Sequence, residues 1–407
     1  MKKLYTLAFS LLFSASCAYA QQPTLTKEDS LNNGQINKSS TIVSGYGEAL
    51  YQHNTNEKTA NINLARAVIF LGHKFNDKIS FFSETEVEDA KVAGGEEGGE
   101  IALEQAYLKF NLNPKNYIVA GLFIPRIGML NENHLPTNFN GAERNQVETF
   151  VIPSTWRELG VGFYGSFNSL PINYNIVLVN GLNSSAFEHG SGVREGRYEG
   201  RNATANNIAI NAAIQYFTGP FQFQLSGYTG GSVGLAPHQA DSLSLSSGAF
   251  GTPVTMGSLH AIYQKNGLTV KALGTLATIK EAENINTAYA NNTPETMYGA
   301  YFEAGYDLFF LNRARFKENQ LIVFARYELM DLNNNIPVNG VYDGTLKQNH
   351  LITGFSYLPI RNVIVKMDAR FAHTGDQNPA LVVNPSPVAL PYKNENVFLN
   401  LGIGYAF

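Results

Sequence analysis

The sequence predicts an all-β protein, a transmembrane antiparallel β-barrel of about sixteen strands. Segments that alternate apolar and polar residues recur along the chain, and their connections alternate between short and long. Charged residues make up only 15% of the chain, against roughly 25% in soluble domains, although mean hydropathy is −0.14. No run approaches the roughly 20 apolar residues that a membrane-spanning helix needs, and an aromatic content of 12% argues against disorder.

The N-terminus predicts export. Two lysines, an apolar run and the A-x-A sequence at residues 18–20 are typical of a signal peptide over residues 1–20. A lipoprotein signal acylated at Cys17 is the alternative, but residues 14–16 lack the usual aliphatic residue. Cleavage would remove Cys17, so the mature chain would have no cysteine. The polar residues 21–40 then form a short periplasmic lead-in.

The barrel is expected over residues 41–407. Its sixteen strands are predicted at 41–53, 61–74, 79–90, 100–112, 117–123, 159–167, 172–181, 205–217, 221–230, 255–265, 268–278, 294–308, 320–331, 346–358, 363–373 and 396–407. In the last strand Leu401 and Ile403 share one face with Leu399, while Asn400 and Gly402 share the other, because side chains alternate with a period of two. A soluble sandwich also alternates, but the signal peptide, the long strands and the loop pattern together favour a membrane barrel.

The connections predict the orientation. Asn266-Gly267 is a strong two-residue hairpin signal, whereas the alternate connections are long and polar, at 124–158, 182–204, 231–254, 279–293, 332–345 and 374–395. Short turns on one side and long loops on the other are typical of bacterial outer-membrane barrels, with both termini periplasmic. The terminal Phe407 ends an alternating strand and resembles the signature read by the outer-membrane barrel assembly machinery.

The third external loop, residues 124–158, is the longest. Loops of this length in a compact protein are usually functional, and a barrel of 16 to 18 strands is wide enough for an aqueous channel. We therefore expect this loop to fold inward and constrict the lumen. Its charged candidates for the constriction are Arg126, Glu132, His134, Glu143, Arg144, Glu148, Arg157 and Glu158. The three arginines either line the opening or pair with the loop's own glutamates, since confined charges are normally paired.

Charged residues on the inner faces of the strands predict the lumen lining. The candidates are Arg66, Glu84, Glu86, Glu88, Lys271, Glu303, Arg326, Glu328, Lys366, Asp368 and Arg370. Rings of one charge select the opposite ion, so this mixed set predicts weak selectivity. Successive same-face carboxylates on one strand are about 7 Å apart. We therefore expect no metal site at Glu84, Glu86 and Glu88, and no cofactor.

The long loop resembles a known family. GLFIPRIG at residues 121–128, NENH at 131–134, FNG at 139–141 and TWRE at 155–158 together resemble the constriction-loop region of porins related to the phosphate-selective porins O and P, especially the Bacteroidetes-type members. The similarity covers about residues 80–165. It implies a passive, trimeric diffusion channel. The phosphate porins line their pore with arginine and lysine, whereas this loop is nearly balanced in charge, so phosphate itself is not implied.

The sequence thus predicts an outer-membrane porin, not an enzyme, in contact with membrane lipid and with small polar or ionic solutes, anions such as phosphate among them. The mildly acidic charge gives no reason to expect nucleic acid. One alternative is a barrel that anchors or assembles partner proteins at the cell surface, which a blocked lumen with apolar loop patches would indicate. An outer-membrane hydrolase is the third, but the eight histidines are scattered without a nucleophile elbow.

Overall fold

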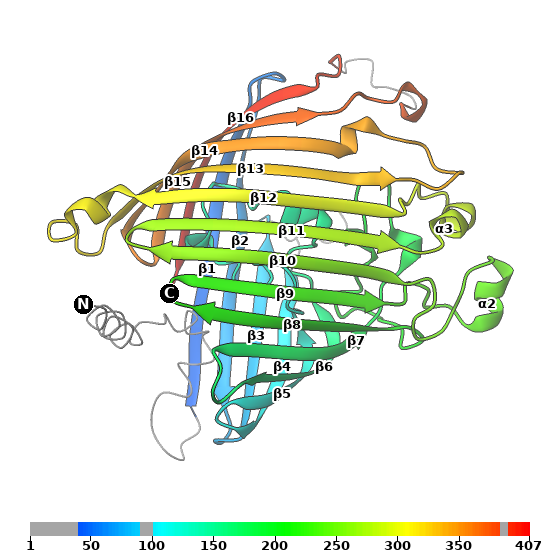
Figure 1. The fold of residues 1–407 in the computed structure, drawn as a ribbon, viewed down its shortest axis with the longest axis horizontal. Coiled ribbons are helices and arrows are strands. Elements are labelled where there is room, and N and C mark those ends of the chain that lie inside the picture. Colours follow the sequence, from blue (N-terminus) through cyan, green and yellow to red (C-terminus); the bar gives the residue numbers. More distant parts are fainter. Residues whose placement is uncertain (1–39, 90–100, 383–389) are drawn as a thin grey trace, which may run out of the picture.

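The computed structural model describes residues 40–89, 101–382 and 390–407. They form a closed barrel in which each strand pairs antiparallel with the next and β1 pairs with β16 (Figure 1). The strands are β1 (Ser40–Asn54), β2 (Thr59–Lys74), β3 (Ile79–Glu88), β4 (Ile101–Asn113), β5 (Asn116–Phe123), β6 (Glu158–Ser166), β7 (Ile172–Asn180), β8 (Ile208–Thr218), β9 (Phe221–Gly230), β10 (Val254–Lys265), β11 (Leu268–Ile279), β12 (Thr296–Asp307), β13 (Gln320–Asn335), β14 (Lys347–Ile360), β15 (Val363–Thr374) and β16 (Glu395–Ala406).

The predicted fold class is confirmed, and each predicted strand has its counterpart. Two ends differ for physical reasons. β8 begins at Ile208, not at 205, because the Asn206 and Asn207 side chains donate to loop carbonyls of Gly234 and Leu182. β13 runs on to Asn335, whose carbonyl accepts the Glu295 N–H and continues the ladder. The predicted signal peptide and the lead-in, except Ser40, lie outside the described residues.

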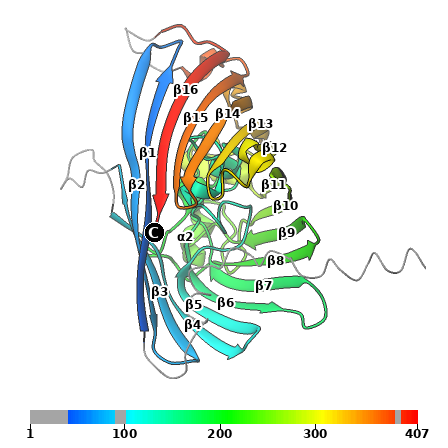
Figure 2. The ribbon, with the colours of Figure 1, turned by 90° about the vertical axis from the view of Figure 1, so that its left-hand side faces the viewer.

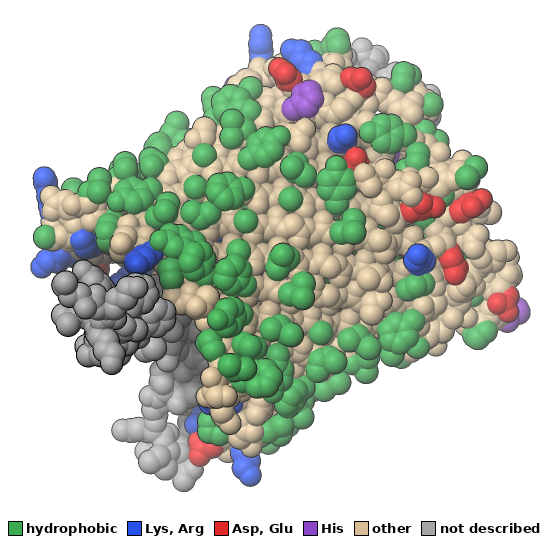
Figure 3. All heavy atoms as spheres, in the orientation of Figure 1, with side chains coloured by type: hydrophobic (Ala, Val, Ile, Leu, Met, Phe, Trp, Pro, Cys, Tyr) green, Lys and Arg blue, Asp and Glu red, His purple; other side chains and the backbone are tan. Residues whose placement is uncertain are grey.

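The two faces of the barrel wall differ as the alternation predicts. In β16, Leu399, Leu401 and Ile403 are 44%, 46% and 53% exposed, whereas Asn400 is buried. Figure 3 shows apolar side chains over the outer surface, with charged side chains gathered toward the two ends. This arrangement suits a lipid-facing outer wall, because a barrel in a membrane carries an apolar outer band.

The connections follow the predicted alternation. Asn266 and Gly267 both have positive φ, 52° and 80°, as a tight two-residue hairpin requires. Figure 1 shows the short turns at the left end and the longer loops at the right, with the short helices α2 (Pro237–Ser242) and α3 (Ala282–Tyr289) among them. Among the described residues, no helix is long and apolar enough to cross a membrane.

A β-bulge alters the wall between β3 and β4. The register shifts between Glu84 and Thr85, so that Glu104 is an extra residue in β4. A bulge re-aims a side chain and increases the local twist. Glu104 is fully buried as a result, whereas its neighbour Leu103 lies on the outer face and is 45% exposed.

The connection between β5 and β6 is the loop predicted to fold inward, and it does so. Figure 2, viewed from the short-turn end, shows blue-green segments inside the ring of strands. The loop contains the short helices η1 (Pro136–Asn138) and η2 (Val147–Val151). η1 contacts β1, β15 and β16, while η2 contacts β11, β12 and β13. The loop therefore reaches strands on both sides of the lumen, which places it across the interior.

Candidate functional site

Glu148 organises the inward loop. Its Oε1 accepts the backbone N–H groups of Met129 and Leu130, the latter at 2.8 Å. Its Oε2 accepts from Asn145 Nδ2 at 2.9 Å and from the Tyr301 hydroxyl on β12 at 2.8 Å. A carboxylate with several donors is well compensated for burial. Glu148 therefore joins the first part of the loop, at residues 129–130, to the later part around Asn145, and it joins both to the wall at Tyr301.

Gly128 makes this arrangement possible. Its φ is +76°, a conformation that L side chains rarely adopt, and a Cβ there would lie 2.5 Å from Glu148 Oε1. Only glycine fits both the backbone and the close carboxylate. The glycine at the end of the GLFIPRIG sequence is thus needed for the turn that aims two N–H groups at Glu148.

The first arm of the loop lies against β8 and β9. Gln215 Nε2 donates to Glu132 Oε2 at 2.7 Å, and Gln224 Nε2 donates to the Gly128 carbonyl at 3.3 Å. Arg126 stacks over the Tyr164 ring at 5.1 Å, and its Nε is 3.9 Å from Glu132 Oε2. Burial raises the pKa of Glu132, and the nearby Arg126 only partly opposes that rise.

The middle of the loop is tied to β11, β12 and β13. Arg326 Nη1 donates to the Asn140 carbonyl at 2.9 Å, and Asn140 Nδ2 donates to Glu303 Oε1 at 3.0 Å. The Gln146 N–H donates to Glu328 Oε2 at 2.6 Å, and Lys271 Nζ donates to the Asn138 carbonyl at 3.1 Å. Charged wall residues thus satisfy the backbone of a loop that has no ladder partner of its own.

Arg326 is also the centre of an ion-pair network. Its Nη1 is 3.1 Å from Glu303 Oε2 and its Nε is 2.7 Å from Glu328 Oε1. Lys271 Nζ adds a longer contact of 3.7 Å to Glu303. Strands β11, β12 and β13 all contribute to this network, so this part of the wall presents positive and negative groups in alternation to the loop.

A second charged group lies where the loop meets β15 and β16. The Ala142 N–H donates to Asp368 Oδ2 at 2.6 Å, and Arg370 Nε is 3.2 Å from Glu143 Oε2. The Lys366 ammonium lies 3.5 Å from the centre of the Phe139 ring. A cation over an aromatic face is favourable when desolvated. A small space between the loop and the wall is lined here by Gly141, Glu143, Arg144, Gln146, Arg326, Ile352, Asp368, Arg370 and Asn400.

The tip of the loop meets β1 to β4. His134 Nε2 lies 2.9 Å from the Tyr46 hydroxyl and 3.6 Å from Glu104 Oε2, and the Tyr46 hydroxyl donates to the same oxygen at 3.1 Å. Arg66 Nε is 2.8 Å from Glu48 Oε1. Arg144 lies among these groups, and burial, followed by the charge of Arg66, lowers its pKa.

Arg157 and Glu158 point elsewhere. Arg157 Nη2 is 2.9 Å from Glu199 Oε2 in the next long loop, and Arg197 Nη2 is 2.8 Å from Glu199 Oε1. Glu158 Oε1 accepts from the Trp156 indole N–H at 3.0 Å, at the start of β6. These two residues hold the end of the inward loop against its neighbours.

The predicted residues therefore fall into groups. Loop residues Glu132, His134, Glu143 and Glu148 contact side chains of the wall, and Arg144 lies among charged wall groups. Arg157 instead contacts Glu199, and Glu158 accepts from Asn180 at the end of β7. The inner-face carboxylates and cations of β12, β13 and β15 meet the loop, whereas Glu88 is half-buried at the end of β3 without contributing a described contact to it. Arg157 pairs with Glu199 of a different loop, whereas Arg126 lies 3.9 Å from Glu132 of its own loop.

Sequence reasoning missed four residues that contact the loop or its partners: Tyr46, Glu48, Glu104 and Tyr301. Glu48 and Tyr46 share a face of β1, so the period of two could have assigned this carboxylate to the lumen. Glu104 could not have been found in this way, because the bulge breaks the alternation between the outward residues Leu103 and Leu108. Tyr301 carried no such signal, because its role depends on the position of Glu148.

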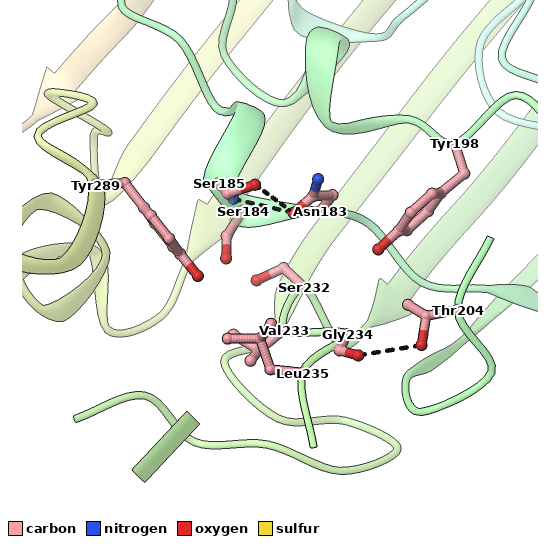
Figure 4. A pocket seen from close by; sticks show the side chains of 10 residues that line it. All are labelled: Asn183, Ser184, Ser185, Tyr198, Thr204, Ser232, Val233, Gly234, Leu235 and Tyr289. Carbon is pink, nitrogen blue, oxygen red and sulfur yellow. Dashed lines mark hydrogen bonds between the residues drawn. The ribbon is translucent and has the colours of Figure 1, made fainter. Parts of the chain in front are cut away.

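A separate pocket lies among the long loops (Figure 4). Its volume is about 220 Å³, and it is lined by Asn183, Ser184, Ser185, Tyr198, Thr204, Ser232, Val233, Gly234, Leu235 and Tyr289. Tyr198 and Tyr289 stand on opposite sides with their hydroxyl groups toward the space. The lining is uncharged, in contrast to the charged groups of the lumen.

The barrel and its inward loop define a bacterial porin-type fold, which comparisons with solved structures support. The chain is similar to an anion-selective porin from Comamonas acidovorans, with a TM-score of 0.54 and 11% identity over 91% of this chain and 100% of that one. The outer-membrane channel DcaP of Acinetobacter baumannii gives 0.55 and 10% identity, covering 91% and 97%. OmpF of Salmonella typhi, solved with daunomycin, gives 0.55 and 13% identity, covering 90% and 97%.

No family model matches the sequence. The chain is 30% identical over 346 residues to an uncharacterised protein of Aquifex aeolicus (strain VF5), covering 81% of this chain and 75% of that protein. It belongs to the same family as that Aquifex protein.

Proposed function

We propose that the protein is an outer-membrane channel for passive diffusion of small polar or ionic solutes. The observation that carries this proposal is the position of the 124–157 loop, which is hydrogen-bonded to the inner wall on both sides of a sixteen-stranded barrel. Such a loop sets the radius of the path. No chemical step is involved, because sieving and electrostatic guidance suffice for diffusion.

The charges of the lumen support weak selectivity. Arg326 and Arg370 lie in the same lining as Glu143 and Asp368, where the loop meets the wall. These groups are packed closely against one another, and a path beside them would meet charges of both signs, which orient a dipolar or charged solute without excluding either sign. Small anions, phosphate included, and small cations would both enter. The proposal includes that this protein is related to the phosphate-selective porins O and P.

The same proposal extends to the two ends of the chain. Residues 1–20 would direct export and be removed, residues 21–40 would remain periplasmic, and 41–407 would be inserted by the barrel assembly machinery. The Phe407 side chain is 68% exposed, while its backbone pairs with Gly45. An exposed terminal aromatic is available for recognition. The resemblance to porins further suggests a homotrimer, with both termini on the periplasmic side.

Planar-bilayer recording of the purified protein tests the channel. We expect stepwise conductance, and a variant in which residues 130–150 are replaced by a short Gly-Ser linker should conduct more. A matched control shortens the external loop 236–248, which lies outside the lumen contacts, and should leave conductance unchanged. If the wild type and the 130–150 variant both lack conductance, the channel proposal fails.

One observation favours a second function. The loop is seated closely: the lumen groups Glu104, Glu328 and Lys366 are all buried. A blocked lumen was the sign expected of a barrel that anchors or assembles partner proteins at the surface, and Val338 and Tyr342 in an external loop are exposed. A non-conducting wild type whose loop variant conducts would support this second function.

A further inference from the structure

The tip of the inward loop and two strands of the wall bring together three residues that can bind a metal ion. Glu84 on β3, Glu104 on β4 and His134 in the loop each place one ligand atom within 4.8 Å of the other two. All three side chains are buried. The bulge in β4 is what aims Glu104 at this point, and the inward fold of the loop is what delivers His134. Three residues distant in sequence thus converge.

Three carboxylate oxygens in this cluster have no hydrogen-bond donor. Glu86 and Glu104 are fully buried and lie within hydrogen-bonding reach of each other. Within the described chain Glu104 Oε1 and both oxygens of Glu86 have no hydrogen-bond partner, and Arg66 Nη1 is 3.5 Å from Glu86 Oε1. Leaving buried carboxylate oxygens without donors is costly. A cation between them would remove that cost.

The local charges leave room for a divalent ion. Four carboxylates gather here, those of Glu48, Glu84, Glu86 and Glu104, and two guanidinium groups face them, Arg66 and Arg144. Arg66 is engaged by Glu48 at 2.8 Å and lies 3.5 Å from Glu86. Lys366 also faces Glu48, but Asp368 offsets its charge. Carboxylates therefore outnumber the guanidinium groups in this cluster, and a bound cation would offset the excess negative charge.

We propose that Glu84, Glu104 and His134, with Glu86 beside them, bind a divalent first-row transition-metal ion such as Zn²⁺. Imidazole nitrogen and carboxylate oxygen bind Zn²⁺ at about 2.0–2.2 Å, so donors around one ion lie roughly 3.5 Å apart. The observed spacing requires side-chain movements on the order of 1 Å. The Tyr46 hydroxyl, already bonded to Glu104, would orient that carboxylate, as outer-shell partners commonly do.

A bound ion would have a structural consequence. It would bridge β3 and β4 to the tip of the loop, through ligands from three segments. The loop would then be held to the wall by coordination in addition to hydrogen bonds. Metal binding can be measured without reference to conductance, so this proposal stands or fails separately from the channel proposal.

The test uses the full-length mature protein, purified in detergent and stripped with EDTA. Equilibrium dialysis against Zn²⁺ should give one ion per chain. Glu104→Gln and His134→Ala should each weaken binding at least tenfold, whereas His134→Cys should retain it, because thiolate is also a zinc ligand. His350→Ala, which removes a buried histidine on β14, is the matched control and should bind as the wild type does.

Circular-dichroism melting confirms that each variant is folded. Co²⁺ absorption provides a second readout, since loss of the imidazole should change the spectrum in His134→Ala and not in His350→Ala. The proposal is overturned if the folded wild type binds no ion. It is equally overturned if Glu104→Gln and His134→Ala retain full affinity, because the ion then lies elsewhere and the cluster is held by hydrogen bonds alone.

Discussion

Arg326 Nη1 on β13 donates to the backbone carbonyl of Asn140 in the inward loop at 2.9 Å. A fully ionised side chain of the wall therefore satisfies a carbonyl of a loop that no strand pairs with. The same guanidinium pairs with Glu303 and Glu328, so one residue contributes both to the position of the loop and to the charge balance of the wall.

Arg326→Met should destabilise the barrel. It leaves Glu303 and Glu328 buried with fewer partners, and removing one member of a buried ion pair costs about 3–5 kcal/mol. Denaturant unfolding in detergent measures the loss. The triple variant Arg326→Met, Glu303→Gln, Glu328→Gln should recover most of it. Equal stability of Arg326→Met and wild type would show that the network is not formed.

Arg370→Gln should move ion selectivity toward cations. Arg370 pairs with Glu143 where the loop meets β15, and the exchange leaves the glutamate's charge uncompensated. In water, the interaction free energy of two unit charges 4 Å apart is about 1 kcal/mol, which corresponds to about a fivefold change in the permeability ratio. Reversal potentials in a salt gradient measure this, and Glu143→Gln should shift them in the opposite direction. A shift of the same sign in both variants would contradict the prediction.

Leu225→Arg should impair insertion or stability. Leu225 lies mid-strand on β9 and is 61% exposed on the outer face. An arginine at the midplane of a lipid-facing wall costs about 2–4 kcal/mol, and the cost falls near the interface. Ile360→Arg, at the short-turn end of β14, is the matched control and should be mild. Unfolding in lipid vesicles gives both values, and equal costs would argue against this placement of the membrane.

Asp343→Asn should remove an acid-sensitive contact between external loops. Asp343 Oδ2 lies 2.9 Å from His189 Nε2, and Thr345 donates to its Oδ1. Partial burial would raise its pKa, but these hydrogen bonds outweigh it, and the pKa is lowered from 3.8. A lowered folded-state pKa stabilises the protein above the unfolded value, and this is lost as pH falls through the folded one. Wild type should thus exceed the variant in melting temperature near neutral pH and match it in strong acid.

The amino-acid sequence alone determined the barrel. Strand positions follow from the alternation of apolar and polar residues, which depends only on residues close to one another in the sequence. The Asn266-Gly267 hairpin follows from positive φ values, which only a few residue types adopt easily. The long loop was visible from its length. Even the inward faces of β12 and β15 could be assigned, since Glu303 and Asp368 alternate with apolar neighbours.

Only the tertiary structure decided what the loop touches. In the sequence Glu148 is one of several glutamates of the loop and nothing distinguishes it from the others. In the structure it links two parts of the loop to Tyr301, because the fold brings together residues 153 positions apart. Glu104 is aimed inward by a bulge, a one-residue shift that the pattern does not encode. Alternation is a local property of the chain, whereas the meeting of Glu84, Glu104 and His134 requires barrel closure and loop entry together.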